Sequence, residues 1–187
     1  AYHDLREASA RFIISLPFPA YSIGGSLGKS KREMHTILDW TIPLLPDEKP
    51  RHLLGIGEID DVFEAVERGV DMFDCVSPTR WARNGSLLVH PRAWHQDADA
   101  AVARKGRINL YNAQYARADA PIEAECDCYT CRTFSLAYLH HLFRAHELLV
   151  YRLATIHNLR FMERLMARVR TAIRAGTFQA LKAEYLA

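Results

Sequence analysis

The sequence predicts an α/β fold built from parallel strand–helix units. Short apolar stretches alternate with helical patterns over the first two-fifths of the chain, and the connections between them are short. This alternation is typical of strands that pair in parallel, with each helix crossing back over the sheet. The 187 residues suffice for one domain with a sizeable core, or for one core with a small satellite.

The first predicted elements are a helix, a strand and a second helix. Residues 4–16 have the pattern expected for the end of a helix. A short strand is expected over residues 20–25, which end in two glycines. The second helix covers 30–40, where Ser30 and Glu33 have the spacing of a capping box. Its apolar stripe, at helical spacing, consists of Met34, Ile37, Leu38 and Thr41.

A further strand–helix unit and a third strand follow a loop at 43–50. A strand is expected over 51–57 and a helix over 58–69, where Gly69 occupies the position that commonly ends helices. The stretch "VDMFDCV", residues 70–76, is the third expected strand. The chain therefore offers three strands for one parallel sheet.

The pattern changes after Pro78. Residues 79–115 have strand-like pieces around a polar middle, which predicts a long-armed hairpin or excursion. Two helices are expected further on, at about 132–153 and 158–175, with Gly176 ending the second. The apolar stripe of that second helix is formed by Phe161, Leu165, Val169 and Ile173.

Composition limits the classes of protein. The chain is 49% hydrophobic and 25% charged, as in soluble globular proteins, and its net charge of +2 demands no nucleic acid. No apolar run is long enough for a membrane span. Clustered cysteines without a secretory signal favour a reducing compartment, so we expect a cytoplasmic protein that is not bound to membranes.

Three of the four cysteines lie in "ECDCYTC", residues 125–131. Cys126, Cys128 and Cys131 form a C-x-C-x2-C pattern, which supplies three thiolates from one tight turn, whereas a structural zinc site needs four ligands. The alternative without a metal ion is three buried, reduced cysteines. Candidates for the fourth ligand are His140, His141, His146 and His157. Cys75 stands alone and is interpreted as a small core residue.

Other polar residues allow a functional interpretation, although ordinary structural roles are common for such positions. Asp74 follows a strand, where an aspartate is usually a cap or an ion-pair partner, and Asp71 should point to the opposite face. Arg80 and Arg83 can grip phosphates and bases, or simply be solvated. Glycines 24 and 25 let the backbone approach a flat ligand closely.

Several motifs together resemble the bacterial queuine-type tRNA-guanine transglycosylase family. They are "YSIGGSLGKS", "RHLLGIG", "GVDMFDCVSPTRWARNG", "ECDCYTCRTFSLAYLHHL" and "TIHNLRFMERLMARVR". The resemblance implies a partial TIM (β/α)8 barrel, with about its last three strands, and an inserted zinc-binding helical subdomain. It implies one structural Zn²⁺ held by Cys126, Cys128, Cys131 and His157. It also implies that the chain is the C-terminal half of such an enzyme and is inactive alone.

The expected division follows from this resemblance. Residues 1–78 would form strand–helix units of the barrel, and 79–157 the tRNA-contacting excursion with the zinc subdomain. Residues 158–187 would be C-terminal helices packing on both. The segment 89–106 is longer than the family pattern suggests, and we assign it no function.

The resemblance also implies roles for single residues. Asp74 would attack ribose C1′ as guanine leaves, and an incoming queuine precursor, 7-aminomethyl-7-deazaguanine, would displace it at the wobble position of tRNA. Arg80 and Arg83 would contact the anticodon loop, and the backbone of Gly24, Gly25 and Ser26 the exchanged guanine or 7-deazaguanine base. Because the chain departs from the family pattern at Ser26 and Lys29, the preferred base stays open.

Helix positions 134, 138 and 141 would contribute to a homodimer according to the same resemblance.

Two alternatives to the queuine-type transglycosylase function stay open. One is an archaeosine-type transglycosylase, which acts elsewhere in tRNA. The other is a non-catalytic, zinc-stabilised subunit for tRNA binding or dimerisation, which would not need Asp74.

Overall fold

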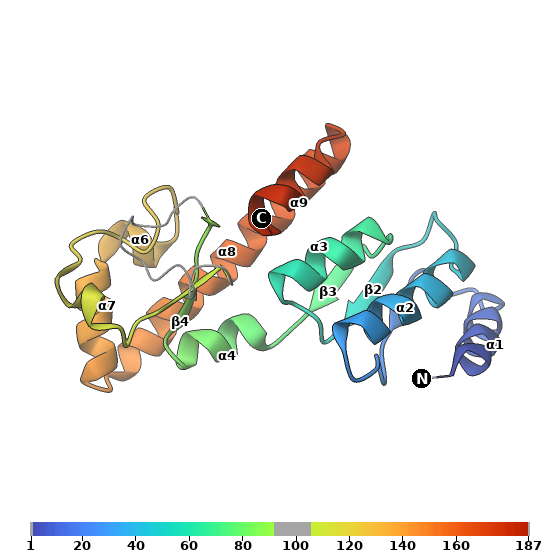
Figure 1. Ribbon diagram of the computed structural model, residues 1–187, viewed down its shortest axis with the longest axis horizontal. Helices are drawn as coiled ribbons and strands as arrows, with labels where there is room; N and C mark the ends of the chain where they lie inside the picture. Colours follow the sequence, from blue (N-terminus) through green and yellow to red (C-terminus); the bar gives the residue numbers. More distant parts are fainter. Residues whose placement is uncertain (1, 92–105, 187) are drawn as a thin grey trace. The chain divides into compact units, whose positions relative to one another are not determined.

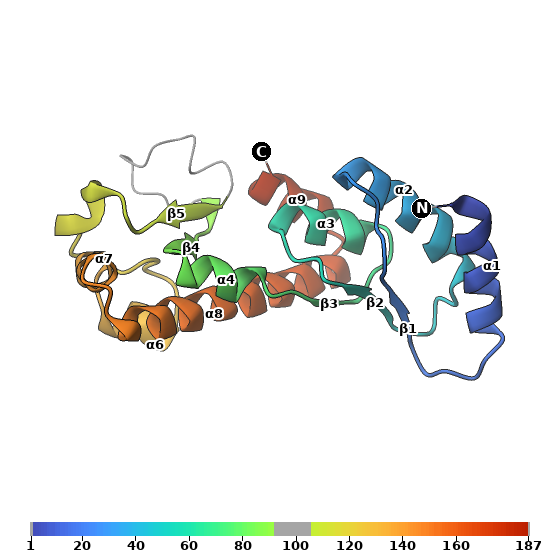
Figure 2. The same ribbon diagram turned by 90° about the horizontal axis from the view of Figure 1, so that it is seen from below.

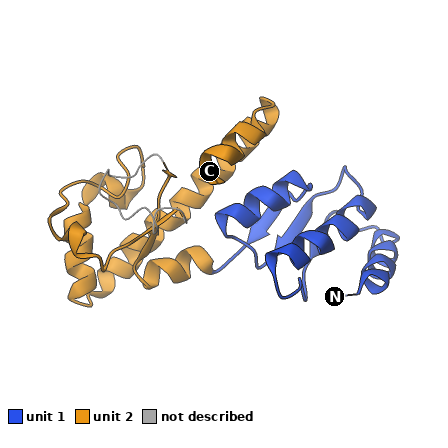
Figure 3. Ribbon diagram, in the orientation of Figure 1, with its two compact units in different colours: residues 1–76 blue, residues 77–187 orange. Residues whose placement is uncertain are grey.

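The computed structural model describes residues 2–91 and 106–186, and it divides the chain into two compact units (Figure 3). Unit 1 comprises Ala1–Val76 and unit 2 comprises Ser77–Ala187. Within the described ranges, no helix combines the length and the apolar character that a membrane span requires.

Unit 1 is a parallel three-stranded sheet with helices, as the sequence predicts (Figure 1). The strand order is β1-β2-β3, and both pairs are parallel. A 3-10 turn, η1, follows the second helix. The elements are α1 (His3–Ile14), β1 (Tyr21–Ile23), α2 (Lys31–Thr41), η1 (Ile42–Leu44), β2 (Arg51–Leu54), α3 (Ile59–Glu67) and β3 (Met72–Asp74).

The predicted cap and stripe of α2 are confirmed. The hydroxyl of Ser30 accepts a hydrogen bond from the Glu33 N–H at 3.2 Å. The Glu33 carboxylate reaches back to accept from the Lys29 N–H at 2.7 Å, one residue before the position that a capping box would use. Burial fixes the helix on the sheet through the predicted stripe, Met34, Ile37, Leu38 and Thr41.

The two faces of the sheet differ in burial. On β2, Arg51 and Leu53 are buried, His52 is half-buried and Leu54 is exposed. The side chain of Leu53 joins the core between the sheet and α2, where it meets Leu38. Because side chains alternate along a strand, one face of the sheet builds the core and the other carries the remaining side chains.

Unit 2 is a helical unit with one β-hairpin. The long helix α8 runs through it with α4 beside it, and the turn at Gly176 folds α9 back towards α8 (Figures 1 and 2). The elements are α4 (Ser77–Arg83), β4 (Ser86–Leu88), β5 (Arg107–Asn109), η3 (Ala113–Arg117), α6 (Tyr129–Thr133), α7 (Leu136–Arg144), α8 (Leu148–Arg174) and α9 (Phe178–Leu186).

The hairpin prediction is confirmed where it can be followed. Strands β4 and β5 pair antiparallel, with Leu87 opposite Ile108. Residues 92–105, most of the unexplained segment 89–106, lie outside the described residues. The start of the predicted excursion is wrong, because Ser77–Arg83 forms the helix α4.

The predicted helices of unit 2 have the wrong boundaries. The expected break near residues 154–158 does not exist, since α8 is continuous from Leu148 to Arg174. The chain breaks instead between α7 and α8, where His146 has a φ of 57°. The predicted stripe is also wrong at its end, because Ile173 is 52% exposed and the neighbouring Ala172 is buried instead.

Candidate metal centre and strand-end site

Four potential metal ligands meet inside unit 2. Cys126 and Cys128 precede α6, Cys131 lies within it, and His157 comes from the middle of α8. All four are buried, and their ligand atoms lie within 4.8 Å of one another. The His157 Nδ1 is 3.8 Å from the sulfur of Cys126, 3.8 Å from that of Cys128 and 3.3 Å from that of Cys131.

The orientation of His157 is fixed from its far side. Its Nε2 lies 2.7 Å from the carbonyl oxygen of Leu88. A carbonyl oxygen only accepts, so Nε2 carries the proton and Nδ1 presents its lone pair to the three sulfurs. Of the other three candidates, His140 directs its Nδ1 to the Leu110 carbonyl at 2.6 Å. His157 lies in the middle of α8 and not in the gap predicted between two helices, since that helix is continuous.

The thiols compete for negative charge. Hydrogen bonds from Cys126 and Cys131 lower the pKa of Cys128 to about 3. Hydrogen bonds with Cys126 and Cys128, followed by burial, raise the pKa of Cys131 above its ordinary value. A cation would relieve this competition, and three sulfurs with one imidazole nitrogen are a donor set of structural zinc sites. Cys126, Cys128, Cys131 and His157 therefore form a plausible zinc site, where a bound ion would cross-link α6 to α8.

Asn158, next to His157, joins three segments of unit 2. Its side-chain oxygen accepts from the Leu88 N–H at 2.9 Å. Its amide nitrogen donates to the carbonyls of Pro78 at 2.9 Å and Ser86 at 3.0 Å. Asn158 is fully buried, so these contacts hold β4 and the first turn of α4 against α8.

The predicted RNA-contacting arginines lie on α4. Arg80 and Arg83 are both exposed and three residues apart, so they share one side of the helix. Trp81 faces the hairpin, where the Arg107 guanidinium lies 4.3 Å from its ring centroid. The helix is thereby fixed on its inner side while its two arginines stay available to a ligand.

Asp74 ends β3 in unit 1, and its side chain is 60% exposed. The His52 Nε2 lies 3.1 Å from its Oδ1, and the Gly55 N–H donates to the same oxygen at 3.3 Å. Asp71 has a structural contact, because its carboxylate accepts from the Arg51 N–H at 2.9 Å. Cys75 is half-buried, and its sulfur lies 3.8 Å from the Gly55 carbonyl oxygen.

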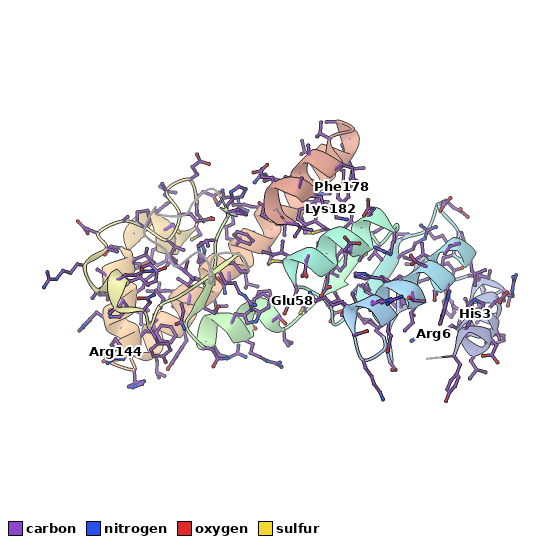
Figure 4. The ribbon with its side chains drawn as sticks, in the orientation of Figure 1. His3, Arg6, Glu58, Arg144, Phe178 and Lys182 are labelled. Carbon is purple, nitrogen blue, oxygen red and sulfur yellow. The ribbon has the colours of Figure 1, made fainter. Side chains whose placement is uncertain are left out.

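The turn of Gly24, Gly25 and Ser26 follows β1 at the same end of the sheet. Arg6 of α1, which is labelled in Figure 4, donates to the carbonyls of Gly24 at 3.1 Å and Ser26 at 2.6 Å. A Cβ at Gly24 would lie 2.6 Å from Leu54 Cδ1, and Gly25 has a φ of +75°. The backbone at Gly25 therefore favours glycine, whereas a side chain at Gly24 would require Leu54 to shift. The chain after β1 runs close to the end of β2.

The site residues fall into two groups, one in each unit. Asp74 and the 24–26 turn share the carboxyl end of the sheet in unit 1, whereas the arginines of α4 and the metal ligands share unit 2. His52, Asn158 and Arg6 were not among the residues predicted from the sequence. A signal existed only for His52, whose alternation along "RHLL" places it on the same face as Leu54.

Comparison with known proteins shows which family the chain belongs to. Residues 1–187 match the sequence model of the family described as Queuine tRNA-ribosyltransferase. A protein of Archaeoglobus fulgidus is 54% identical over 99% of this chain and 45% of its own length. Queuine tRNA-ribosyltransferases of Roseiflexus sp. and Pelotomaculum thermopropionicum are 50% and 48% identical over 99% of this chain, and the match covers 44% and 46% of their lengths.

The chain thus spans less than half the length of these relatives. The match nevertheless covers every residue of the chain, including the strand end with Asp74 and the four buried metal ligands. The chain belongs to the queuine tRNA-ribosyltransferase family.

Proposed function

We propose that this chain is the C-terminal part of an enzyme that exchanges guanine for 7-aminomethyl-7-deazaguanine at the wobble position of tRNA. The observation that carries the proposal is the exposed carboxylate of Asp74 at the carboxyl end of a parallel strand. The Roseiflexus sp. relative, a queuine tRNA-ribosyltransferase, is similar over the same residues. In parallel α/β sheets, ligands bind beyond this end of the strands.

Asp74 is the nucleophile in the proposed reaction. A carboxylate oxygen forms a bond to ribose C1′ while the bond from C1′ to the purine breaks, and the purine leaves with the electron pair and takes a proton from water. The incoming base then attacks C1′ and releases the carboxylate. Two displacements retain the configuration at C1′ and leave the RNA chain intact.

The base lies, in this proposal, against the turn after β1. The positive φ of Gly25 and the tight approach of Gly24 to Leu54 support a backbone that can meet a flat ring. Arg6 holds two carbonyls of this turn and so keeps its shape. We propose that the three strands are the last strands of a TIM barrel, in which both features face the substrate.

Unit 2 binds the tRNA in this proposal. The exposed Arg80 and Arg83 suit phosphates and base edges of the anticodon loop. Zn²⁺, when bound by the four buried ligands, supplies a structural cross-link and takes no part in the base exchange. Tyr129 and Tyr138 are exposed, which supports a homodimer contact in the longer enzyme. A tRNA substrate supports a cytoplasmic location.

A chimeric enzyme tests the proposal. The N-terminal part of the Roseiflexus sp. relative, up to the start of its match, is joined to this chain; we call this protein the chimera. Purified chimera should incorporate labelled guanine into tRNA, and 7-aminomethyl-7-deazaguanine should compete. Exchange at a position outside the anticodon would favour the archaeosine-type alternative. A folded chimera that binds tRNA without any exchange would favour the non-catalytic subunit.

A further inference from the structure

We propose that His52 is a positioning residue for Asp74, which holds Oδ1 and leaves Oδ2 as the oxygen that attacks ribose C1′. The inference rests on the proposed function, and it adds a residue and an atom to it. His52 belongs to β2, the neighbour of the strand that carries Asp74.

The two contacts of the Asp74 carboxylate within the described residues fall on one oxygen. Oδ1 lies 3.1 Å from the His52 Nε2 and 3.3 Å from the Gly55 nitrogen, which donates its proton. A carboxylate fixed through one oxygen keeps the lone pairs of the other for a ligand. The arrangement therefore distinguishes two oxygens that are equivalent in a free aspartate.

The register of the strands explains why a histidine reaches this carboxylate. His52 lies opposite Met72, and Leu54 lies opposite Asp74, so all four side chains share one face of the sheet. The contact from His52 to Asp74 is diagonal, because Asp74 lies two residues beyond the direct partner of His52 on the neighbouring strand. An imidazole presents Nε2 far enough from its Cβ to span this diagonal, whereas a side chain that ends at the Nδ1 position falls short.

Positioning matters because Asp74 is exposed. A side chain that is 60% exposed lacks the packing that fixes a buried one, and the carboxylate torsion of aspartate is broad. The Gly55 N–H and the adjacent His52 imidazole, both at Oδ1, restrict that torsion before the substrate arrives. A nucleophile held near its attack geometry reacts faster than one that must be oriented in each turnover.

The step balances without a proton from His52. Oδ2 forms a bond to C1′, the bond from C1′ to the purine nitrogen breaks, and the electron pair and a proton from water leave with the purine. In the second displacement the Oδ2–C1′ bond breaks, its electron pair returns to Asp74, and the incoming base loses a proton to water. Gly55 remains a donor to Oδ1 and His52 remains in contact with it throughout, so their role is orientation.

The chimera provides the test through two amides of different length at position 52. In His52→Gln the amide nitrogen can occupy the place of the imidazole Nε2, whereas in His52→Asn it ends near the place of Nδ1 and cannot reach Asp74. Ser22→Ala is the control, since Ser22 is the exposed partner of His52 on β1. Single-turnover exchange, kcat and KM for tRNA, and unfolding temperature are measured for each protein.

We expect His52→Asn to lower kcat about tenfold, with KM for tRNA unchanged, because the contact that is lost lies at the reacting carboxylate and not at the bound tRNA. His52→Gln should recover most of the rate, and Ser22→Ala should match the unsubstituted chimera. Equal kcat values for the two amides, or a raised kcat in His52→Asn, would overturn the inference.

Comparing Asp74→Asn with His52→Asn distinguishes a failure of the proposed function from a failure of this inference. If Asp74→Asn retains exchange, Asp74 is not the nucleophile and the role of His52 fails with it. If Asp74→Asn is inactive while His52→Asn keeps the full kcat, Asp74 remains the nucleophile and only the role of His52 is removed.

Discussion

Asn158 and Leu88 are joined by a buried hydrogen bond of 2.9 Å, and His157 contacts the same residue from its carbonyl side at 2.7 Å. Two consecutive residues of α8 therefore hold both backbone groups of Leu88. One of them faces the three cysteines, and the other also holds the Pro78 carbonyl at the start of α4. The metal ligands and the arginine-bearing helix thus share one support.

Replacing Asn158 by leucine should destabilise unit 2 strongly. The Leu88 N–H and the carbonyls of Pro78 and Ser86 would be left buried without this partner, at a cost of about 3 kcal/mol or more. Denaturant unfolding of the chain measures the loss, and hydrogen exchange at Leu88 localises it. Asn84→Leu is the matched control on the exposed side, with an expected change within about 0.5 kcal/mol. Equal effects of the two variants would contradict the role of Asn158.

One zinc ion per chain is expected in the purified protein. Cys128→Ala removes one of the four donors and should abolish stable metal binding, with faster hydrogen exchange over residues 126–175. Elemental analysis gives the metal content, and Cys75→Ala, outside the cluster, should keep its zinc. A full complement of zinc in a Cys128→Ala/His157→Ala double variant would refute the assignment.

Arg83→Ala should weaken tRNA binding by the chimera without changing the chemistry of Asp74. The loss of one phosphate contact makes the dependence of log K on log salt shallower by about 0.7–0.9. Binding isotherms at several salt concentrations measure this slope. Arg11→Ala, which removes an exposed, ion-paired arginine from α1, is the control. A slope that does not change in Arg83→Ala, or that changes equally in both variants, would exclude Arg83 from the RNA interface.

His90 should make the stability of unit 2 depend on pH. Burial, followed by the charge of Arg168, lowers the pKa of His90 below 6.5, although its Nε2 lies 2.8 Å from a carboxylate oxygen of Glu184. Below pH 6.5 the unfolded chain takes up a proton that the folded chain does not, so stability falls as pH drops from 6.5 through the lowered value. His90→Gln should flatten this part of the profile, and His141→Gln, at an exposed position, should leave it as it is. Identical profiles for His90→Gln and the unsubstituted chain would contradict this.

Helix α2 shows where the apolar periodicity of the sequence was sufficient to predict the structure. The α2 stripe of Met34, Ile37 and Leu38 is buried as predicted because a single apolar face meets the sheet. The predicted helix break near His157 is wrong. Thr155 and Asn158 have low helix propensity, but here Asn158 forms hydrogen bonds to β4 and α4, and these contacts outweigh that propensity.

In the candidate site, too, residues from one local segment were predicted, whereas residues brought together by the fold were not. The cysteine spacing identified three metal ligands because they come from one turn, but spacing alone left four histidines open for the fourth. The resemblance to the family singled out His157, and the structure brings that residue to the three cysteines. The true helix break at His146 was missed because a positive φ is uncommon outside glycine and has no strong sequence signal. His52 was missed because its diagonal contact depends on strand register.

The central claim is that Asp74 becomes covalently attached to the RNA. The most direct measurement is a denaturing gel of the chimera incubated with tRNA while free guanine is depleted, followed by mass spectrometry of the modified peptide. We predict an enzyme–RNA adduct that maps to Asp74, disappears when guanine is restored, and is absent in Asp74→Asn although tRNA still binds. An adduct of equal yield in Asp74→Asn, or one that maps to another residue, would contradict the account.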